Sequence, residues 1–120
     1  MLTEEAITLL STPSNLRQGD CIFVDTYVPM DIQRIAEAIC KANHLPQDCK
    51  LSIRTYDGKI NDIGGEAIAT ILRNAEHLPN GFRLNLISCQ MSDKGAHTIA
   101  TALGTAENLP KGFSLDLSKM

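Results

Sequence analysis

Cysteine and histidine side chains are the groups in this chain best suited to chemistry, as nucleophiles, bases or metal ligands. The 120 residues include Cys21, Cys40, Cys49, Cys89, His44, His77 and His97. No Cys-x-x-Cys or His-x-x-x-His pair occurs, so the spacing disfavours zinc and no metal or other cofactor is expected. Cys89 with His97 would be the best nucleophile and base. A cysteine-dependent enzyme is therefore one alternative, disfavoured because burial raises the pKa of a thiol.

The four cysteines lack the density and spacing of a small secreted disulfide framework, so we expect them to be reduced. Cys49 occupies the position that Phe82 and Phe113 fill in later, similar segments. This equivalence predicts that Cys49 is a small buried hydrophobic residue and has no chemical role.

Two aspartates and a glycine pair are the remaining candidates for catalysis or anion binding. Asp62 and Asp93 precede helical patterns at equivalent places, and Gly64-Gly65 follows the first of them. A carboxylate at a helix start accepts hydrogen bonds from the unpaired amides of the first turn. We therefore predict that both aspartates are helix caps and that the glycines form a tight turn. No phosphate-binding loop or nucleophile elbow occurs, so we expect no enzymatic activity.

These residues belong to a sequence that repeats. The Leu-Pro dipeptides of the chain begin at Leu45, Leu78 and Leu109, which are 33 and 31 residues apart. Each is followed by alternating apolar and polar residues, as in Leu84-Asn85-Leu86, which is typical of a strand with one buried face. A helical pattern follows about ten residues later, as with Ile99 and Leu103. Repetition on this scale predicts stacked strand–helix units that share one core.

The N-terminal part contains a degraded copy of the same unit. Asn15 to Gly19 lack the proline but precede Ile22-Phe23-Val24, and Asp31 then stands where a helix cap is expected. Thr3 to Leu10 form an amphipathic pattern that begins at Thr3 or Glu4. We expect one domain over 1–120, with a capping helix in 1–14, repeats near 15–44, 45–77 and 78–108, and a partial repeat in 109–120.

Units of this length with Leu-x-Leu strands resemble the leucine-rich repeat family, in its long-repeat subtype found in ribonuclease inhibitor. The best copy runs from Leu84 to Leu103, with Cys89 at the position of the family's Asn-or-Cys ladder. The Leu-Pro-x-Gly-Phe-x-Leu-x-Leu segment also resembles repeats in secreted effectors of intracellular bacteria. The resemblance implies an α/β solenoid with parallel strands on its concave side, helices on its convex side, and protein binding as its function.

The earlier copies depart from this family pattern. Tyr27 and Tyr56 occupy the ladder position, and the copy that contains Asp57-Gly58-Lys59 is longer by two residues than the next. The hydrogen-bond ladder is therefore largely missing. We expect both tyrosines to contribute more to the core than to ligand contacts, with their hydroxyls bonded to other partners.

Residues between the core positions of the strands are expected to point away from the helices. Phe23 and Ile87 are apolar there although the fold does not require it, and arginine is enriched at interfaces. These features predict a partner-binding face, against the alternative that scattered exposed apolar residues are ordinary. The proposed contact residues are Phe23, Asp25, Ser52, Arg54, Arg83, Asn85, Ile87 and Asp116.

The last copy stops at Lys119-Met120, where its helix should begin, so its strand is expected to have an open edge. An open edge favours pairing with another chain, so we expect either self-association through this end or a chain that is cut from a longer array. The alternative to a protein-binding module is therefore a structural domain that associates with itself through Leu115 to Met120.

Charge and hydropathy limit the kind of partner and the location. The net charge of −3 gives no electrostatic reason to expect nucleic acid. No apolar run approaches the roughly 20 residues that span a bilayer, and the start of the chain is acidic where a signal peptide would be basic. We expect another protein, including a host protein if the effector resemblance extends to function, as the partner. The expected location is the cytoplasm, or a host cytosol reached without a cleavable signal peptide.

Overall fold

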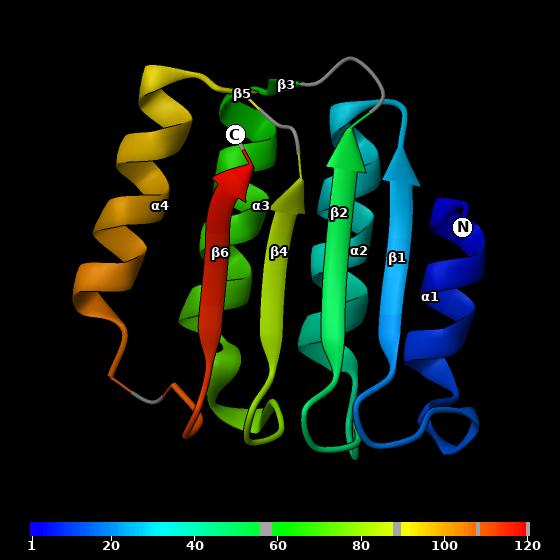
Figure 1. The fold of residues 1–120 in the computed structure, drawn as a ribbon. Helices are drawn as coiled ribbons and strands as arrows, with labels where there is room; N and C mark the ends of the chain where they lie inside the picture. The colour runs from blue at the N-terminus through cyan, green and yellow to red at the C-terminus, as the bar shows by residue number, and fades with distance from the viewer. Residues whose placement is uncertain (56–58, 88–89, 108, 120) are drawn as a thin grey trace.

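Four strands pair side by side in the order in which they occur along the chain. The structure is a computed structural model that describes residues 1–55, 59–87, 90–107 and 109–119. Its main sheet is parallel throughout, with the order β1-β2-β4-β6 (Figure 1). The strands are β1 (Cys21–Thr26), β2 (Lys50–Thr55), β4 (Arg83–Ile87) and β6 (Ser114–Lys119).

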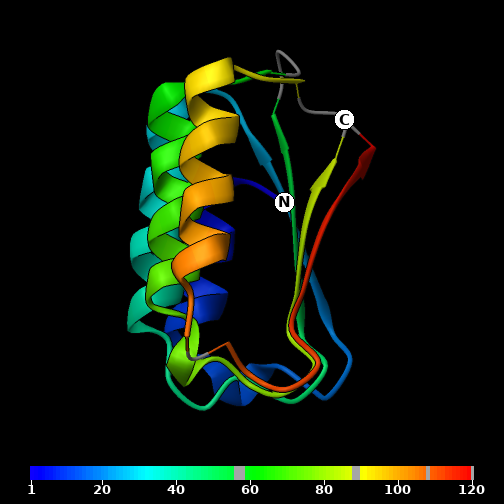
Figure 2. The ribbon, with the colours of Figure 1, turned by 90° about the vertical axis from the view of Figure 1, so that its left-hand side faces the viewer.

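The helices all lie on one face of this sheet, as the side view shows (Figure 2). They are α1 (Thr3–Ser11), α2 (Pro29–Lys41), α3 (Asp62–Arg73) and α4 (Asp93–Thr105), with short 3-10 turns η1 (Pro13–Asn15) and η2 (Ala75–His77). Two short strands, β3 (Lys59–Ile60) and β5 (Gln90–Met91), pair in parallel beyond the main sheet. The predicted α/β class is confirmed, with a parallel four-stranded sheet and four helices.

The core lies between the sheet and the helices. Strand pairing places Leu51 beside Leu84, and Leu84 beside Leu115. Equivalent leucines of successive copies are therefore neighbours on adjacent parallel strands. Alternate residues along a strand point to opposite faces, so each strand contributes an apolar row to the core and leaves its other side chains on the helix-free face. Leu51 and Leu84 are fully buried.

The turns before the strands are also stacked on one another. The amide of Gly19 donates to the carbonyl of Gln47, and the amide of Asp48 donates to the carbonyl of Asn80. Gly81 has φ of 76°, and Asp48 at the equivalent position has φ of 61°. Asp tolerates this left-handed conformation better than most residues, which explains how the 45–49 segment makes the turn without the glycine found in later copies.

The helix caps differ from the sequence prediction by one residue. The side chain of Asn61 accepts from the amide of Gly64 at 3.0 Å, and that of Ser92 accepts from the amide of Gly95 at 3.0 Å. Asp62 and Asp93 are the first residues of α3 and α4, so the prediction that they are the caps is wrong. Asp62 instead accepts from the hydroxyl of Ser92 at 2.6 Å, which links the starts of the two helices.

Asp31 likewise lies inside α2, which begins at Pro29, and its carboxylate accepts from the amides of Tyr27 and Val28 at 3.0 and 3.3 Å. Asp31 therefore accepts hydrogen bonds at the start of the helix, as expected of a cap, but it does so from within the first turn. Tyr27 is 54% exposed, so the expectation that it packs in the core is wrong. The expected ladder residues Tyr56 and Cys89 lie outside the described residues.

The helices end several residues before the Leu-Pro dipeptides. α3 ends at Arg73, and η2 then covers Ala75–His77 before Leu78. α4 ends at Thr105, four positions before Leu109. The restriction that proline places on the preceding residue explains the extended conformation of Leu78, while the helix itself stops earlier.

Candidate functional site

The helix-free face of the sheet carries a charged and aromatic cluster at its β1–β2 end. The guanidinium of Arg54 contacts the carboxylate of Asp25, with Nε and Oδ1 2.7 Å apart. The same guanidinium lies over the ring of Phe23, 5.4 Å from the ring centroid. Strand pairing explains this geometry, because Asp25 lies directly beside Arg54 and Phe23 is two residues earlier on the same face.

This cluster fixes the orientation of a long side chain that remains accessible. The side chain of Arg54 is 52% exposed, whereas that of Asp25 is 28% exposed. An exposed ion pair adds little to folding stability, typically about 0–1 kcal/mol. Its consequence here is to hold Arg54 in one conformation with part of its surface facing solvent.

Ser52 lies in the centre of the same face, but it is not available to a partner. Only 3% of its surface is exposed, so its predicted role as a contact residue is corrected. Its hydroxyl accepts from the side-chain amide of Asn85 at 3.1 Å and lies 3.6 Å from the sulfur of Cys21. Neighbouring side chains therefore cover Ser52, and its hydroxyl helps to hold half-buried Asn85 in place.

Cys21 is a member of this face that sequence reasoning did not include. It is exposed, and it precedes Phe23 and Asp25 in the same alternation along β1. The alternation of side chains along β1 also places Cys21 on this face, but the predicted contact residues begin at Phe23. A free thiol at this place can report on coverage of the face by another molecule.

The β4–β6 end of the face is more open. Arg83 and Asp116 are exposed, and Asn85 and Ile87 are half-buried. Asn85, Ile87 and Asp116, together with Leu86, line a shallow hollow of about 170 Å³. The predicted contact residues other than Ser52 thus lie along one face, with the Arg54 cluster at one end and this hollow at the other.

Further exposed apolar side chains occur in the connections that follow the strands and in the first turns of the helices. Tyr27, Val28 and Met30 follow β1 and are 54%, 53% and 61% exposed, and Ile63 in the first turn of α3 is 48% exposed. No binding role was predicted for Val28, Met30 or Ile63. Their apolar character at the starts of helices was the signal, but helical patterns place apolar residues in the core by default.

The described thiols other than Cys21 are poorly suited to nucleophilic chemistry. Cys49 is fully buried, and this burial, reinforced by the nearby charges of Asp20 and Cys21, raises its pKa to about 11. Burial also raises the pKa of Cys40. Cys49 is therefore a small hydrophobic core residue, as predicted. Across residues 1–55, 59–87, 90–107 and 109–119, no three Cys, His, Asp or Glu residues cluster in a way that could hold a metal ion.

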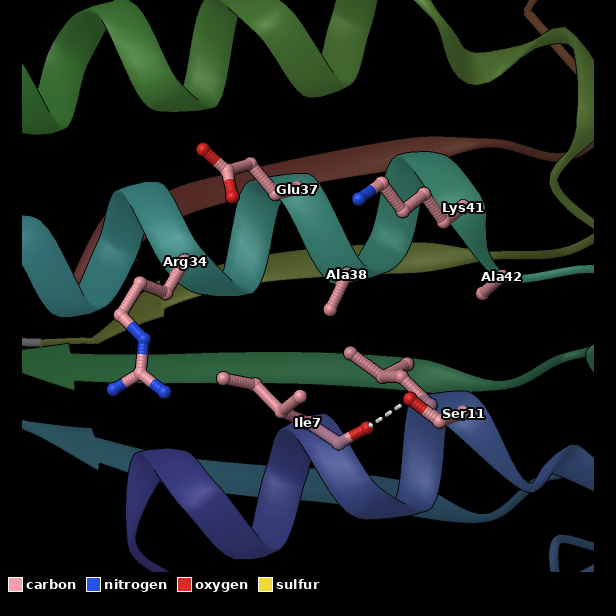
Figure 3. A pocket seen from close by; sticks show the side chains of 8 residues that line it. Ile7, Ser11, Arg34, Glu37, Ala38, Lys41 and Ala42 are labelled. Carbon is pink, nitrogen blue, oxygen red and sulfur yellow. Dashed lines mark hydrogen bonds between the residues drawn. The ribbon is translucent and has the colours of Figure 1, made fainter.

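A larger groove, of about 300 Å³, lies between α1 and α2 (Figure 3). Arg34 reaches from α2 toward α1, where it forms an ion pair with Glu4. Ser11 donates to the carbonyl of Ile7 within its own helix at 2.9 Å. Glu37 and Lys41 are exposed at the rim. These are the contacts of two neighbouring amphipathic helices, and they bring together no nucleophile and base.

Comparisons with protein-family models, curated proteins and solved structures find no match to this chain. Within the described part of the chain, no helix has the length and apolar character needed to cross a membrane. The surface chemistry of the helix-free face is therefore the best guide to function.

Proposed function

We propose that the chain is a non-catalytic protein-binding module and that the helix-free face, with the adjoining strand ends, is its docking surface. The observation that carries the proposal is the Arg54 cluster. Its guanidinium is held by Asp25 and lies over Phe23, yet the side chain is half exposed. Arginine and aromatic side chains in fixed positions are the commonest energetic centres of protein interfaces.

Preorganisation is what makes this cluster suited to binding. A free arginine side chain loses conformational entropy when it is immobilised at an interface, at a cost of about 0.5–1.5 kcal/mol. Arg54 is already ordered by two contacts within the sheet, so a partner incurs less of that cost. Asp25 compensates the charge through Nε, and the other guanidinium nitrogens can still donate to a carboxylate or carbonyl of the partner.

The small size of the sheet supports a docking surface that extends beyond its helix-free face. Four strands at a spacing of about 4.8 Å form a narrow ribbon, whereas a standard interface takes about 800 Å² from each partner. The exposed side chains of Tyr27, Val28 and Met30 lie beside the end of β1 and supply further apolar area. The docking surface therefore includes this strand-end segment as well as the sheet face.

Family membership is part of the same proposal. The strands pair in chain order, the turns before them stack through backbone hydrogen bonds, and the helices share one face. This arrangement supports a short leucine-rich-repeat solenoid with its sheet on the concave side. The resemblance to bacterial effectors makes a host protein the first partner to seek.

The proposal predicts that a sheet-face variant loses its partner while remaining folded. Immobilised wild-type protein and the variant Phe23→Ala/Arg54→Ala/Ile87→Ala are compared for capture from a host-cell lysate, and the captured protein is then purified and titrated by calorimetry. Each truncated hot-spot residue typically costs about 2 kcal/mol, so the triple variant should bind at least about 100-fold more weakly.

The matched control changes the opposite side of the molecule, with the variant Gln33→Ala/Glu37→Ala/Lys41→Ala on the exposed part of α2. It should retain wild-type affinity, and circular dichroism should show that both variants are folded. Equal binding by the sheet-face variant and the wild type, or loss of binding in the α2 variant alone, would contradict the proposal.

A further inference from the structure

Two cationic side chains lie side by side on the helix-free face. Lys50 of β2 and Arg83 of β4 are register partners, and the alternation along each strand directs both away from the helices. Arg83 is exposed and Lys50 is half-buried. Adjacent strands are about 4.8 Å apart, so the two side chains start close together. Like charges held side by side on a sheet repel each other and oppose folding.

Neither cation has a side-chain partner in the described part of the chain. The ion pairs of that part are Glu4–Arg34, Asp25–Arg54 and Glu66–Arg73. Asp20 and Asp48, in the turns that lead into β1 and β2, accept hydrogen bonds from backbone and side-chain amides of those turns. The positive charges of Lys50 and Arg83 are therefore available to another molecule.

The helix-free face is more cationic than the molecule as a whole. Of the charged side chains that the structure describes on this face, three are cationic and two are anionic, namely Lys50, Arg54, Arg83, Asp25 and Asp116. The whole chain has 11 lysines and arginines against 14 aspartates and glutamates. The net charge of −3 repels an acidic partner, so any attraction of such a partner to this face is local.

Charge complementarity favours a partner that presents carboxylates to these cations. Building on the docking function proposed above, we propose that the partner is an acidic protein segment and that one of its carboxylates lies between Lys50 and Arg83. A carboxylate has two oxygens, so it can accept from the Lys50 ammonium and the Arg83 guanidinium at once. This contact also removes the repulsion between the two cations.

The spacing of the cations along β2 indicates how such a segment lies. Lys50 and Arg54 are four residues apart on one strand, which corresponds to about 13 Å. In an extended partner segment, side chains four residues apart span the same distance and point to the same side. A second carboxylate can then reach the guanidinium nitrogens of Arg54 that Asp25 does not contact. Ser52, between the two cations, is short and buried, so it does not obstruct the segment.

The first test uses deca-glutamate, an acidic probe that is extended because its like charges repel. The isotope-labelled full chain is titrated with the peptide to about 10 mM, because a contact limited to a few charges is expected to be weak. The amides of Lys50 and Arg83 should shift together and saturably, and an increase of salt from about 20 to about 200 mM should weaken binding. Deca-lysine, which the net charge would favour, should leave these amides unchanged.

The deciding variant is Lys50→Gln/Arg83→Gln, which should bind deca-glutamate at least about tenfold more weakly, as expected for the loss of close charge pairs. The matched control Lys41→Gln/Lys94→Gln changes the net charge equally, through exposed residues of α2 and α4. It should bind as the wild type does. Because Lys50→Gln/Arg83→Gln relieves repulsion, its urea midpoint should equal or exceed that of the wild type, which shows that weaker binding is not caused by unfolding.

The captured partner separates the acidic segment from the docking function itself. Loss of its binding in both Phe23→Ala/Arg54→Ala/Ile87→Ala and Lys50→Gln/Arg83→Gln would support both. Loss in the first variant alone would overturn the acidic segment and leave the docking surface in place, whereas unchanged binding in both variants would contradict both. Deca-glutamate that shifts neither the Lys50 nor the Arg83 amide, or that binds Lys50→Gln/Arg83→Gln as well as the control, would also overturn the acidic segment.

Discussion

Replacing Gly65 with alanine is expected to lower the free energy of unfolding by about 2–3 kcal/mol, as overpacking of a well-packed interior does. A Cβ atom at Gly65 would lie 2.5 Å from the Cα of Gly95 and 3.0 Å from its carbonyl oxygen. Both neighbours are backbone atoms, so no side-chain rotation can relieve the contact. The helices α3 and α4 would have to separate, which would disturb the core contacts of Ile68 and Ile99.

The measurement is urea unfolding followed by circular dichroism, with Gly104→Ala as the matched control. Gly104 lies in α4, on the other side of the contact from Gly65 in α3, but a Cβ atom at Gly104 would have no heavy atom within 4 Å. Alanine is favoured over glycine in helices by about 0.8–1 kcal/mol, so this control should be more stable than the wild type. Equal effects of the two substitutions would show that the close approach of α3 and α4 is absent.

Replacing Phe82 with alanine is expected to cost about 3–5 kcal/mol, the usual range for a buried aromatic residue. Phe82, which directly precedes β4, is fully buried, and its ring stacks on that of Phe113 with centroids 6.1 Å apart. Truncation would leave a cavity next to the small side chain of Cys49, which occupies the equivalent place in the previous copy. The Cys49 side chain is too small to fill this cavity.

Phe113→Ala is the control, because it removes the same ring from the equivalent position of the last copy. Phe113 is only half-buried, so the loss should be about half that of Phe82→Ala. Both variants are compared by urea unfolding followed by circular dichroism. A larger loss for Phe113→Ala than for Phe82→Ala would contradict the assigned burial.

The sequence was sufficient to predict the parallel sheet because its signal is redundant. Leu-x-Leu alternation recurs after each Leu-Pro dipeptide, and only one register places Leu51, Leu84 and Leu115 in the same apolar row. The caps were less predictable, because Asn61 and Asp62 are adjacent residues that can both accept from a helix start. The choice depends on backbone angles set by the preceding β3 strand.

The helix-free face was predicted only in outline, because its details depend on neighbours that are distant in sequence. Burial of Ser52 results from side chains on both adjacent strands, including Asn85. The contact of Arg54 with Asp25 and Phe23 likewise requires the exact pairing of β1 with β2. Alternation along one strand identifies which residues share a face, but not which of them remain accessible.

NMR mapping is the sharpest test of whether the helix-free face is a docking surface. Isotope-labelled protein is titrated with the captured partner, and amide shifts are followed. We expect the largest amide shift changes in β1, β2 and β4, centred on Phe23, Arg54 and Ile87. Changes confined to the exposed surfaces of α2 and α3, with the sheet amides unchanged, would contradict it.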